Sequence, residues 1–338
     1  MNKRTVIVIL AVIVAFISVS GYLVFQRGGP GGPLEPPEKI TFGVDLSVIS
    51  APVWVAENRR YFQEEHLDMN IIDYPSGRTA LAEMLAKGNL DMVTVAQTPV
   101  MYNSFSRNDY AIIVGMAYSY DDVLMLARSD RGIATAADLR GKKVGTPVGS
   151  SGHFFLSLLL LYSGLNMSDV TVVDIDAPDL PKALSEGTVD AIAIWQPHIN
   201  DTRALLGEKA LLLPSKNIYR EDFYIVSQTS LTQDKPEALK RFLTALDRAE
   251  DFIQKNREEA ITIVAGRLRL DREIVASIWD GYEFKLFLDQ SIVTDLEAEA
   301  RWAIDNKYTT ETKVPDYLDF IYRDALAASK PEAVKIIR

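Results

Sequence analysis

The stretch GTPVGSSGHFF, residues 145–155, places four small residues between a β-like run and an apolar helical run. The first N–H groups of a helix have no partner inside it, and the helix dipole favours an anion at this end. Gly149 and Gly152 allow a ligand to approach the backbone, and Ser150 and Ser151 add hydroxyl donors. The stretch therefore predicts an anion-binding turn, and the alternative is that one serine only caps the helix.

A second turn, YPSGRTA at residues 74–80, also leads from a strand-like run into a helical one. Ser76 and Gly77 offer donors, and Arg78 is the best-placed cation of the predicted loops. A guanidinium group can bind an oxyanion through two parallel hydrogen bonds. We expect Arg78 to pair with an anionic group, and the alternative is a solvated residue in the first helical turn.

Aromatic and amide side chains at strand ends complete the predicted binding site. Tyr118 follows the fourth strand-like run and Trp195 ends a later one. Such rings supply apolar contact with few rotamers to fix, although most aromatic side chains in α/β proteins fill the core. The other predicted ligand contacts are Ser50, Gln97, Thr98, His153, Asp176 and Gln196.

Catalysis is not expected from the carboxylates of these loops. Two carboxylates can carry out acid–base chemistry, but each loop aspartate has a simpler interpretation as a turn residue or helix N-cap. No partner residue marks any of them as perturbed. These carboxylates are Asp45, Asp121, Asp122, Asp174 and Asp176.

Composition excludes several classes of protein. The 338 residues contain no cysteine, which excludes disulfides, thiolate metal sites and a Cys nucleophile, and no metal cluster or cofactor is predicted around the three histidines. A net charge of −10 leaves no basic face to neutralise the phosphates of nucleic acid. The length is that of about two domains.

Short strand-like runs alternate with helical stretches from residue 39 onward, which predicts a mostly parallel sheet with helices on both faces. The pattern starts again near residue 143, and beyond Leu231 we expect helices to the end of the chain. The expected strands are 39–45, 69–74, 90–96, 110–118, 143–148, 170–176 and 190–195, and the expected helices include 51–65, 78–88, 98–107, 236–255 and 291–306.

An internal repeat links the two α/β blocks. In each copy a helix ends at a glycine suited to a left-handed C-cap, and a buried-type strand follows and ends in Gln beside Pro. The matched pairs, all at one offset, are Leu85 and Leu184, Gly88 and Gly187, Asp91 and Asp190, and Gln97 and Gln196. Ligands bind at the carboxyl ends of strands in open α/β sheets. The repeat therefore predicts Gln97 and Gln196 on opposite walls of one cleft.

The N-terminus indicates export. Lys3 and Arg4 precede TVIVILAVIVAFISVSGYLVF, which carries no charge and is long enough to cross a bilayer. The positive residues stay on the cytoplasmic side, so the rest of the chain is extracytoplasmic. The run predicts an uncleaved anchor, and the alternative is a signal peptide cleaved near SVS. The Gly- and Pro-rich stretch that follows reads as a flexible tether.

Five segments together resemble the solute-binding proteins of ABC importers, of the nitrate, sulfonate, taurine and thiamine-pyrimidine group. They are SAPVWVAENRRYF, LAKGNLDMVTVAQTP, DLRGKKVGTPVGSSGHFFLSLLL, GLNMSDVTVVDID and ALSEGTVDAIAIWQP, within residues 39–250. The resemblance implies an α/β type II periplasmic-binding-protein fold, in which two lobes joined by two crossover strands close on a small ligand. It also implies ligand contacts at the GSSG turn.

The expected domain organisation follows from these patterns. We expect the crossover strands near residues 121–127 and 223–228. The expected parts are a transmembrane helix at 1–26, a linker at 27–38, lobe 1 at 39–122 with 224–338, and lobe 2 at 123–223.

The expected ligand is a small organic oxyanion such as an aliphatic sulfonate or a taurine-like compound. Many members of the family carry an acid where this chain has Gln196, which disfavours a cationic or amino-bearing ligand. The alternatives are a flat heterocycle such as a pyrimidine or thiamine precursor, a membrane-tethered sensor module, and, least favoured, a pyrimidine-synthase-like enzyme. The expected partners of the monomer are an ABC permease and its ATPase.

Overall fold

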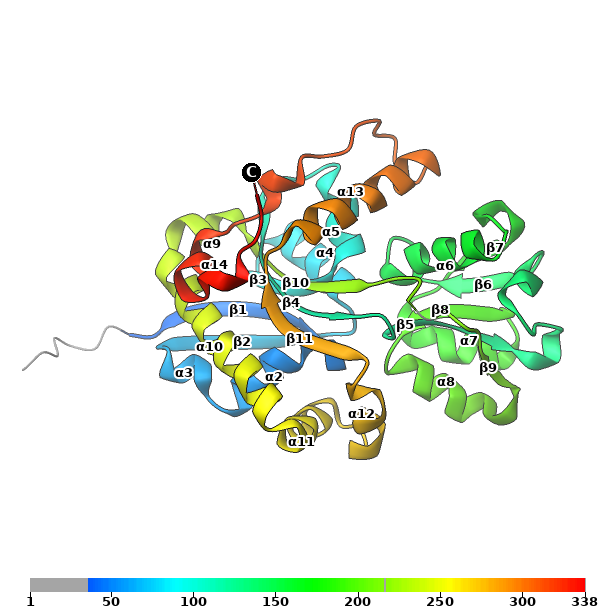
Figure 1. The fold of residues 1–338 in the computed structure, drawn as a ribbon, viewed down its shortest axis with the longest axis horizontal. Helices are drawn as coiled ribbons and strands as arrows, with labels where there is room; N and C mark the ends of the chain where they lie inside the picture. The colour runs from blue at the N-terminus through cyan, green and yellow to red at the C-terminus, as the bar shows by residue number, and fades with distance from the viewer. Residues whose placement is uncertain (1–35, 216, 338) are drawn as a thin grey trace, which may run out of the picture. The chain divides into compact units, whose positions relative to one another are not determined.

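Two β-sheets organise the described part of the chain, one at the centre of each lobe (Figure 1). The computed structural model describes residues 36–215 and 217–337. The predicted transmembrane helix at 1–26 and most of the predicted linker lie outside the described residues. Within the described ranges, no helix has both the length and the apolar composition needed to cross a bilayer. The described residues from Glu38 onward form one compact unit, which holds both lobes.

Lobe 1 is built on a six-stranded sheet in the order β11-β4-β10-β3-β1-β2. β1 runs parallel to β2 and β3, whereas β10 runs antiparallel to its neighbours β3 and β4. The strands are β1 (Glu38–Asp45), β2 (Leu67–Tyr74), β3 (Met92–Ala96), β4 (Tyr110–Ser119), β10 (Glu221–Gln228) and β11 (Tyr282–Phe287). The helices are α2 (Ala51–Asn58), α3 (Tyr61–Glu64), α4 (Gly77–Lys87), α5 (Gln97–Ser104), α9 (Thr229–Asp234), α10 (Pro236–Lys255), α11 (Arg257–Leu268), α12 (Arg272–Trp279), α13 (Gln290–Asp305) and α14 (Asp324–Ser329).

Lobe 2 is built on a five-stranded sheet in the order β7-β6-β8-β5-β9. β6 runs parallel to β7 and β8, and β5 runs antiparallel to β8 and β9. The strands are β5 (Val123–Arg128), β6 (Lys143–Thr146), β7 (Thr171–Asp174), β8 (Ala191–Trp195) and β9 (Ala210–Leu212). The helices are α6 (Ser151–Tyr162), α7 (Leu180–Glu186) and α8 (His198–Leu206).

The internal repeat is present as two equivalent helix–strand corners. Gly88 and Gly187 end α4 and α7 in the left-handed conformation, with φ of 65° and 78°. Asp91 Oδ2 accepts from Thr41 N at 2.7 Å, and Asp190 Oδ2 accepts from Lys143 N at 3.0 Å. Each aspartate therefore ties the start of its strand to the neighbouring parallel strand.

Two segments connect the lobes. β4 leads into β5 through residues 120–122, and β9 leads back into β10 through residues 213–220 (Figure 1). The second connection differs from the prediction, because Glu221 already pairs with Ser119 of β4. Residues 221–223 therefore belong to the sheet of lobe 1 and not to lobe 2.

Two other predictions for lobe 1 were wrong. The chain beyond Leu231 is not wholly helical, because β11 pairs antiparallel with β4 and buries Tyr282, Phe284 and Leu286 on alternate positions. The predicted helix at 51–65 is interrupted, because Arg60 adopts the left-handed conformation with φ of 59°.

Trp302 of α13 joins the hydrophobic cores of the two lobes. Its ring packs edge-on against His153 and Phe154 of lobe 2, at centroid distances of 5.3 and 5.0 Å. On the lobe 1 side it contacts Tyr102 and Tyr308, at 6.3 and 5.0 Å. The described structure is therefore one in which the lobes touch.

Candidate functional site

A small enclosed cavity lies between the lobes where both connections pass. Its volume is about 20 Å³, which is space for about one water molecule. Lobe 1 and the connection supply Asp45, Ser47, Ile49, Ser76, Gly77, Arg78, Ala96, Pro99, Asp122, Glu221 and Phe223, and lobe 2 supplies Ser150, Ser151 and Trp195.

Asp45, at the end of β1, is the first of three buried carboxyl groups in this cavity. Its Oδ2 accepts a hydrogen bond from Gly77 N at 2.8 Å, so it lies at the N-terminus of α4. Burial nevertheless raises the pKa of Asp45 to about 7 because removal from water disfavours the charged form. The chain therefore places its own carboxyl group where the second predicted turn was expected to receive an anion.

Asp122 and Glu221 form an adjacent pair at the two lobe connections. Burial raises the pKa of both, and the neighbouring Asp122 carboxylate raises that of Glu221 further. The Tyr282 hydroxyl of β11 donates to Asp122 Oδ1, and the Ser151 hydroxyl lowers the pKa of Glu221 in part. Two carboxyl groups so close cannot both ionise easily, so a shared proton is favoured.

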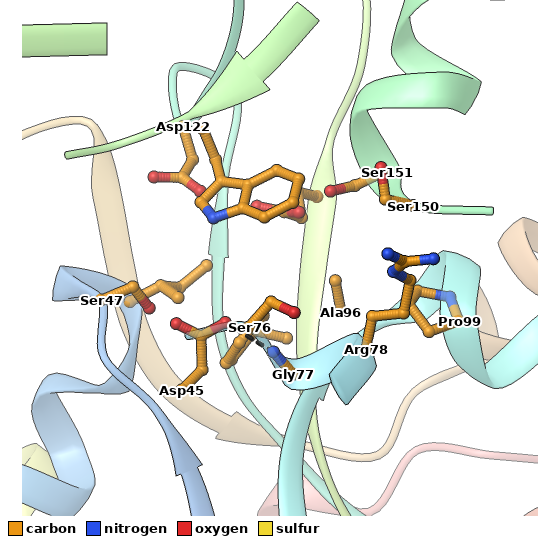
Figure 2. A pocket seen from close by; sticks show the side chains of 14 residues that line it. Asp45, Ser47, Ser76, Gly77, Arg78, Ala96, Pro99, Asp122, Ser150 and Ser151 are labelled. Carbon is orange, nitrogen blue, oxygen red and sulfur yellow. Dashed lines mark hydrogen bonds between the residues drawn. The ribbon is translucent and has the colours of Figure 1, made fainter. Parts of the chain in front are cut away.

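Arg78, Ser150 and Ser151 lie at one end of the cavity, and Asp45 and Asp122 lie at the other (Figure 2). Its guanidinium crosses between the lobes and donates to Val148 O at 3.2 Å and to Asp176 Oδ1 at 2.9 Å.

A second cavity, of about 180 Å³, shares Ser76, Arg78 and Trp195 with the first. It is the outer of the two, since Asp176, which is mostly exposed, also lines it. Arg78 therefore stands between an inner, acidic cavity and a larger outer one.

The GSSG turn begins α6 beside this cavity. Gly149 has a positive φ of 80°, and the Ser150 hydroxyl donates to Pro147 O at 2.6 Å, so its side chain does not cap the helix. Gly152 is required for packing, because a Cβ atom there would lie 2.6 Å from Ala193 O. The cap alternative is therefore wrong for Ser150, and the first amides of α6 stay without an intrahelical partner.

Comparison with known proteins identifies the family of this chain. The NMT1/THI5 like family matches residues 48–260, more than half of the chain. The chain belongs to the NMT1/THI5-like family. A Bacillus subtilis (strain 168) protein provisionally named as aliphatic sulfonates-binding is 26% identical over 289 residues, covering 83% of each chain.

Solved structures show that this NMT1/THI5-like chain has the periplasmic-binding-protein fold. It is similar to the alkanesulfonate-binding protein SsuA from Xanthomonas axonopodis pv. citri bound to MOPS, with a TM-score of 0.75 and 20% identity over 85% of this chain and 99% of that one. It is also similar to the desulfurization enzyme DSZB, with a TM-score of 0.65 and 15% identity over 87% and 99%. The fold therefore occurs in both binding proteins and an enzyme.

Seven of the predicted contacts of this family member line one or both cavities. Ser76, Arg78 and Trp195 line both. Gly77, Ser150 and Ser151 line the inner cavity and Asp176 the outer one. The structure thus brings the two predicted turns together at one cavity.

Gln97 and Thr98 do not line the cavity, and Gln97 does not form a wall of the cleft as predicted. Gln97 Nε2 donates to the buried Glu299 Oε1 at 2.8 Å, and its Oε1 accepts from Asp222 N at 2.6 Å. Thr98 also lies beside Glu299 and lowers its pKa in part. Both side chains hold α5 against α13 and β10 because they point toward the buried Glu299.

Gln196 also fails to form a cleft wall. Its backbone N donates to Asp122 O at 3.2 Å, and its buried side chain is outside the cavity lining. Tyr118 is likewise outside, because its ring is covered by the Arg220 guanidinium at 4.1 Å.

His153, Gly149 and Ser50 have structural surroundings too. The His153 ring packs against Tyr308 at 4.6 Å and against Trp302, and burial lowers its pKa to about 4. Gly149 N points to His153 Nδ1 at 3.5 Å. Ser50 is fully buried at the start of α2. These three lie outside the cavity lining.

The acidic end of the site does not follow from the local sequence patterns. Asp45 and Asp122 have the pattern of turn residues, and no pattern marks Glu221 or Ser47, although all four line the inner cavity. A weak signal existed, because Asp122 and Glu221 border the two lobe connections. Across residues 36–215 and 217–337, no three His, Cys, Asp or Glu side chains are arranged to hold a metal ion.

Proposed function

We propose that the chain is an extracytoplasmic solute-binding protein of an ABC importer that captures a small organic oxyanion, such as an aliphatic sulfonate or taurine-like compound. The observation that carries this proposal is a cavity between two lobes, lined from both, with Arg78 reaching from one lobe to the other. The name of the Bacillus subtilis relative supports the same ligand class, and the strand order supports the type II arrangement.

The mechanism is closure of the lobes around the ligand. A ligand stabilises the closed form only through contacts that the open form cannot make. Arg78 and Asp176 are 33% and 72% exposed, so their ion pair contributes only about 0–1 kcal/mol. The bridge therefore opens easily, and a ligand oxyanion can replace Asp176 as the partner of Arg78.

Groups of both lobes meet at the anion end. Arg78 supplies a guanidinium from α4, and the start of α6 supplies backbone amides with the hydroxyl of Ser151. An oxyanion here receives charge-assisted hydrogen bonds from both lobes. Binding at this end therefore favours the closed form.

The proposal assigns the chain to transport and not to catalysis. Its partners are a membrane permease and an ATPase that recognise the closed form, and the protein acts as a monomer. Its extracytoplasmic location rests on the charge pattern and apolar run of residues 1–26.

A thermal-shift screen of the purified full chain tests the ligand class. The panel contains aliphatic sulfonates, taurine, nitrate, pyrimidines and amino acids, and a specific ligand raises the melting temperature by mass action. The proposal expects a shift with a sulfonate that is reduced in Arg78→Ala and retained in the exposed control Arg301→Ala. A shift with pyrimidines alone would favour the heterocycle alternative.

A further inference from the structure

Trp302, in the last turn of α13, lies where the two lobes meet and lines neither cavity. Among the hydrophobic side chains of residues 36–215 and 217–337, it alone packs against the cores of both lobes. On the lobe 2 side its ring contacts His153 and Phe154 of α6, at centroid distances of 5.3 and 5.0 Å. This contact requires the lobes to be close together, and it involves no group of the two cavities.

Five aromatic side chains form this contact, and we refer to Tyr102, His153, Phe154, Trp302 and Tyr308 as the interlobe aromatic cluster. The Tyr308 ring lies 4.6 Å from His153 and 5.0 Å from Trp302, and Tyr102 lies 6.3 Å from Trp302. Three of the pairs cross from one lobe to the other. Edge-on aromatic pairs contribute more than the area they bury, so separating the lobes loses these three contacts.

α13 holds Trp302 in a fixed position on lobe 1. Glu299, one helical turn before Trp302, is buried and accepts a hydrogen bond from Gln97 Nε2 of α5 at 2.8 Å. On the other side, Asn306 Nδ2 donates to Trp302 O at 2.9 Å at the end of the helix. A side chain on an anchored element loses little freedom when it makes a further contact. Trp302 is therefore preorganised to receive α6.

Two helices carry both the wall of the inner cavity and the interlobe aromatic cluster. In α5 of lobe 1, Pro99 lines the cavity and Tyr102 belongs to the cluster. In α6 of lobe 2, Ser151 lines the cavity and Phe154 belongs to the cluster. Residues three apart lie on the same face of a helix. Closing the cavity and forming the cluster are therefore one movement of α6 against α5.

The indole N–H of Trp302 opposes this movement. Nε1 is buried and has no hydrogen-bond partner among the described residues. A polar group that is buried without a partner loses its hydrogen bonds to water, which is unfavourable. The rings of the cluster therefore favour closure while the buried N–H favours opening, so the contact stays reversible.

We propose that Trp302 is a latch for lobe closure, which contacts no ligand but stabilises the closed form and so raises the affinity of the site for every ligand. This inference rests on the proposed function and concerns the regulation of the same site. When only the closed form binds, the apparent affinity is proportional to the closed fraction. Loss of the latch therefore weakens all ligands by one common factor, whereas loss of a ligand contact discriminates among them.

The distance between two spin labels on the full chain tests the latch without any ligand. The chain has no cysteine, so Lys87→Cys and Lys182→Cys provide two unique labelling sites on exposed positions of α4 and α7. Both helices begin beside the outer cavity, so opening of the lobes lengthens this distance. We expect Trp302→Ala to add a population with a longer distance, measured by electron paramagnetic resonance. A distribution identical to that of the labelled parent chain would overturn the latch.

Two further variants separate the latch from a folding defect. Phe154→Leu removes the partner ring on lobe 2 but keeps an apolar side chain, and it should show the longer distance in a smaller fraction of molecules. If Trp302→Ala does not fold, Phe154→Leu decides alone, and an unchanged distribution in it contradicts the latch. Tyr162→Ala, at an exposed aromatic residue of α6, is the matched control. Equal opening in this control would also overturn the proposal.

Titration calorimetry with taurine and ethanesulfonate distinguishes failure of the latch from failure of the proposed function. Trp302→Ala should weaken the binding of both by the same factor, about tenfold, which is the usual effect of losing one or two aromatic pairs. Unequal losses would make Trp302 a ligand contact and contradict the latch. Binding of neither compound to the wild type would contradict the sulfonate function, and the spin-label distances would still decide on the latch.

Discussion

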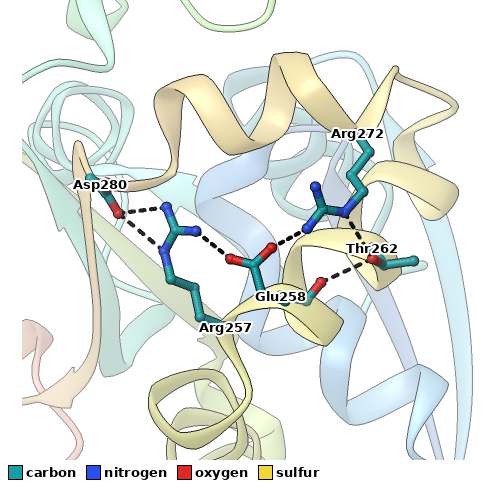
Figure 3. Close-up of polar contacts among 5 residues, drawn as sticks. All are labelled: Arg257, Glu258, Thr262, Arg272 and Asp280. Atoms are coloured by element: carbon teal, nitrogen blue, oxygen red, sulfur yellow. Dashed lines mark hydrogen bonds and ion pairs between the residues drawn. The ribbon is translucent and has the colours of Figure 1, made fainter.

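Two groups of carboxylates in this protein have opposite surroundings. On the surface of lobe 1, Glu258 of α11 is held between Arg257, at 2.7 Å, and Arg272 of α12, and Arg257 also pairs with Asp280 at 2.9 Å (Figure 3). These arginines lower the pKa of Glu258, with Arg257 the larger cause. In the inner cavity, Arg78 bonds to Val148 and Asp176. Burial raises the pKa of Asp45, Asp122 and Glu221 there.

The difference shows how solvent exposure and burial change the charge of a carboxyl group in this protein. In the surface network the carboxylates pair with solvent-exposed arginines of the same chain. These ion pairs contribute little to stability and leave no charge without a partner. Asp45, Asp122 and Glu221 are buried, and burial favours their protonated forms. Carboxyl groups with perturbed pKa values are frequent at functional sites.

The largest expected effect is on the pH dependence of stability. A carboxyl group with a raised pKa holds a proton in the folded protein that the unfolded chain has already released, so its stabilisation is lost as pH rises through the folded pKa. For Asp45 that window lies between about 4 and 7. Each such proton changes the free energy of unfolding by about 1.4 kcal/mol per pH unit.

Urea unfolding of the ligand-free chain should therefore give higher stability at pH 6 than at pH 8. His153 opposes this trend up to about pH 6.5, because its pKa is lowered from 6.5 to about 4 on folding. The lowered pKa of His198 acts in the same direction. Glu258 contributes only in acid, where its lowered pKa makes the stability decrease as the pH decreases. Stability that rises from pH 6 to pH 8 would contradict the raised pKa values of the cavity.

The next largest effect is expected from Glu221→Gln without ligand. Neutralising a carboxyl group whose charged form is disfavoured by burial should raise the free energy of unfolding at pH 8 by about 1–3 kcal/mol. The variant should also flatten the pH dependence between pH 6 and pH 8. A variant less stable than the wild type at pH 8 would mean that the chain itself satisfies this carboxylate.

Arg78→Ala tests the other end of the same cavity. Loss of the guanidinium should lower the affinity for a sulfonate by about tenfold or more, the effect of one hydrogen bond to a charged group. Stability without ligand should change little, because the ion pair with Asp176 is exposed. The two effects are measured by calorimetry and urea unfolding, and an unchanged affinity would remove Arg78 from the site.

The smallest effect is expected from Glu258→Gln in the surface network. Its partners are solvated arginines, so we expect no measurable change in melting temperature at pH 7 and no change in ligand binding. A loss of stability equal to that of a core substitution would show that the surface network matters more than its exposure indicates.

Much of the fold could be predicted from local patterns. The alternation of strands and helices and the left-handed glycines at 88 and 187 depend on residues close in the sequence. β11 was missed even though Tyr282, Phe284 and Leu286 alternate with charged residues, because the surrounding helical pattern outweighed six residues.

The candidate site could be predicted only in part, because only some of its features depend on residues close in the sequence. The two turns that carry Arg78 and Ser151 lie at helix starts, a feature of local sequence. The direction of a buried side chain depends on its tertiary neighbours, and this turned Gln97 toward Glu299 and away from the cleft.

The sequence by itself determined two α/β lobes and a pair of donor-rich turns that face one cleft. Only the tertiary structure decided that Asp45, Asp122 and Glu221, which are distant in the sequence, are buried together beside those turns. Each is an ordinary turn or strand-end residue in its local context. Their raised pKa values follow from burial and from one another, and both exist only after the chain has folded.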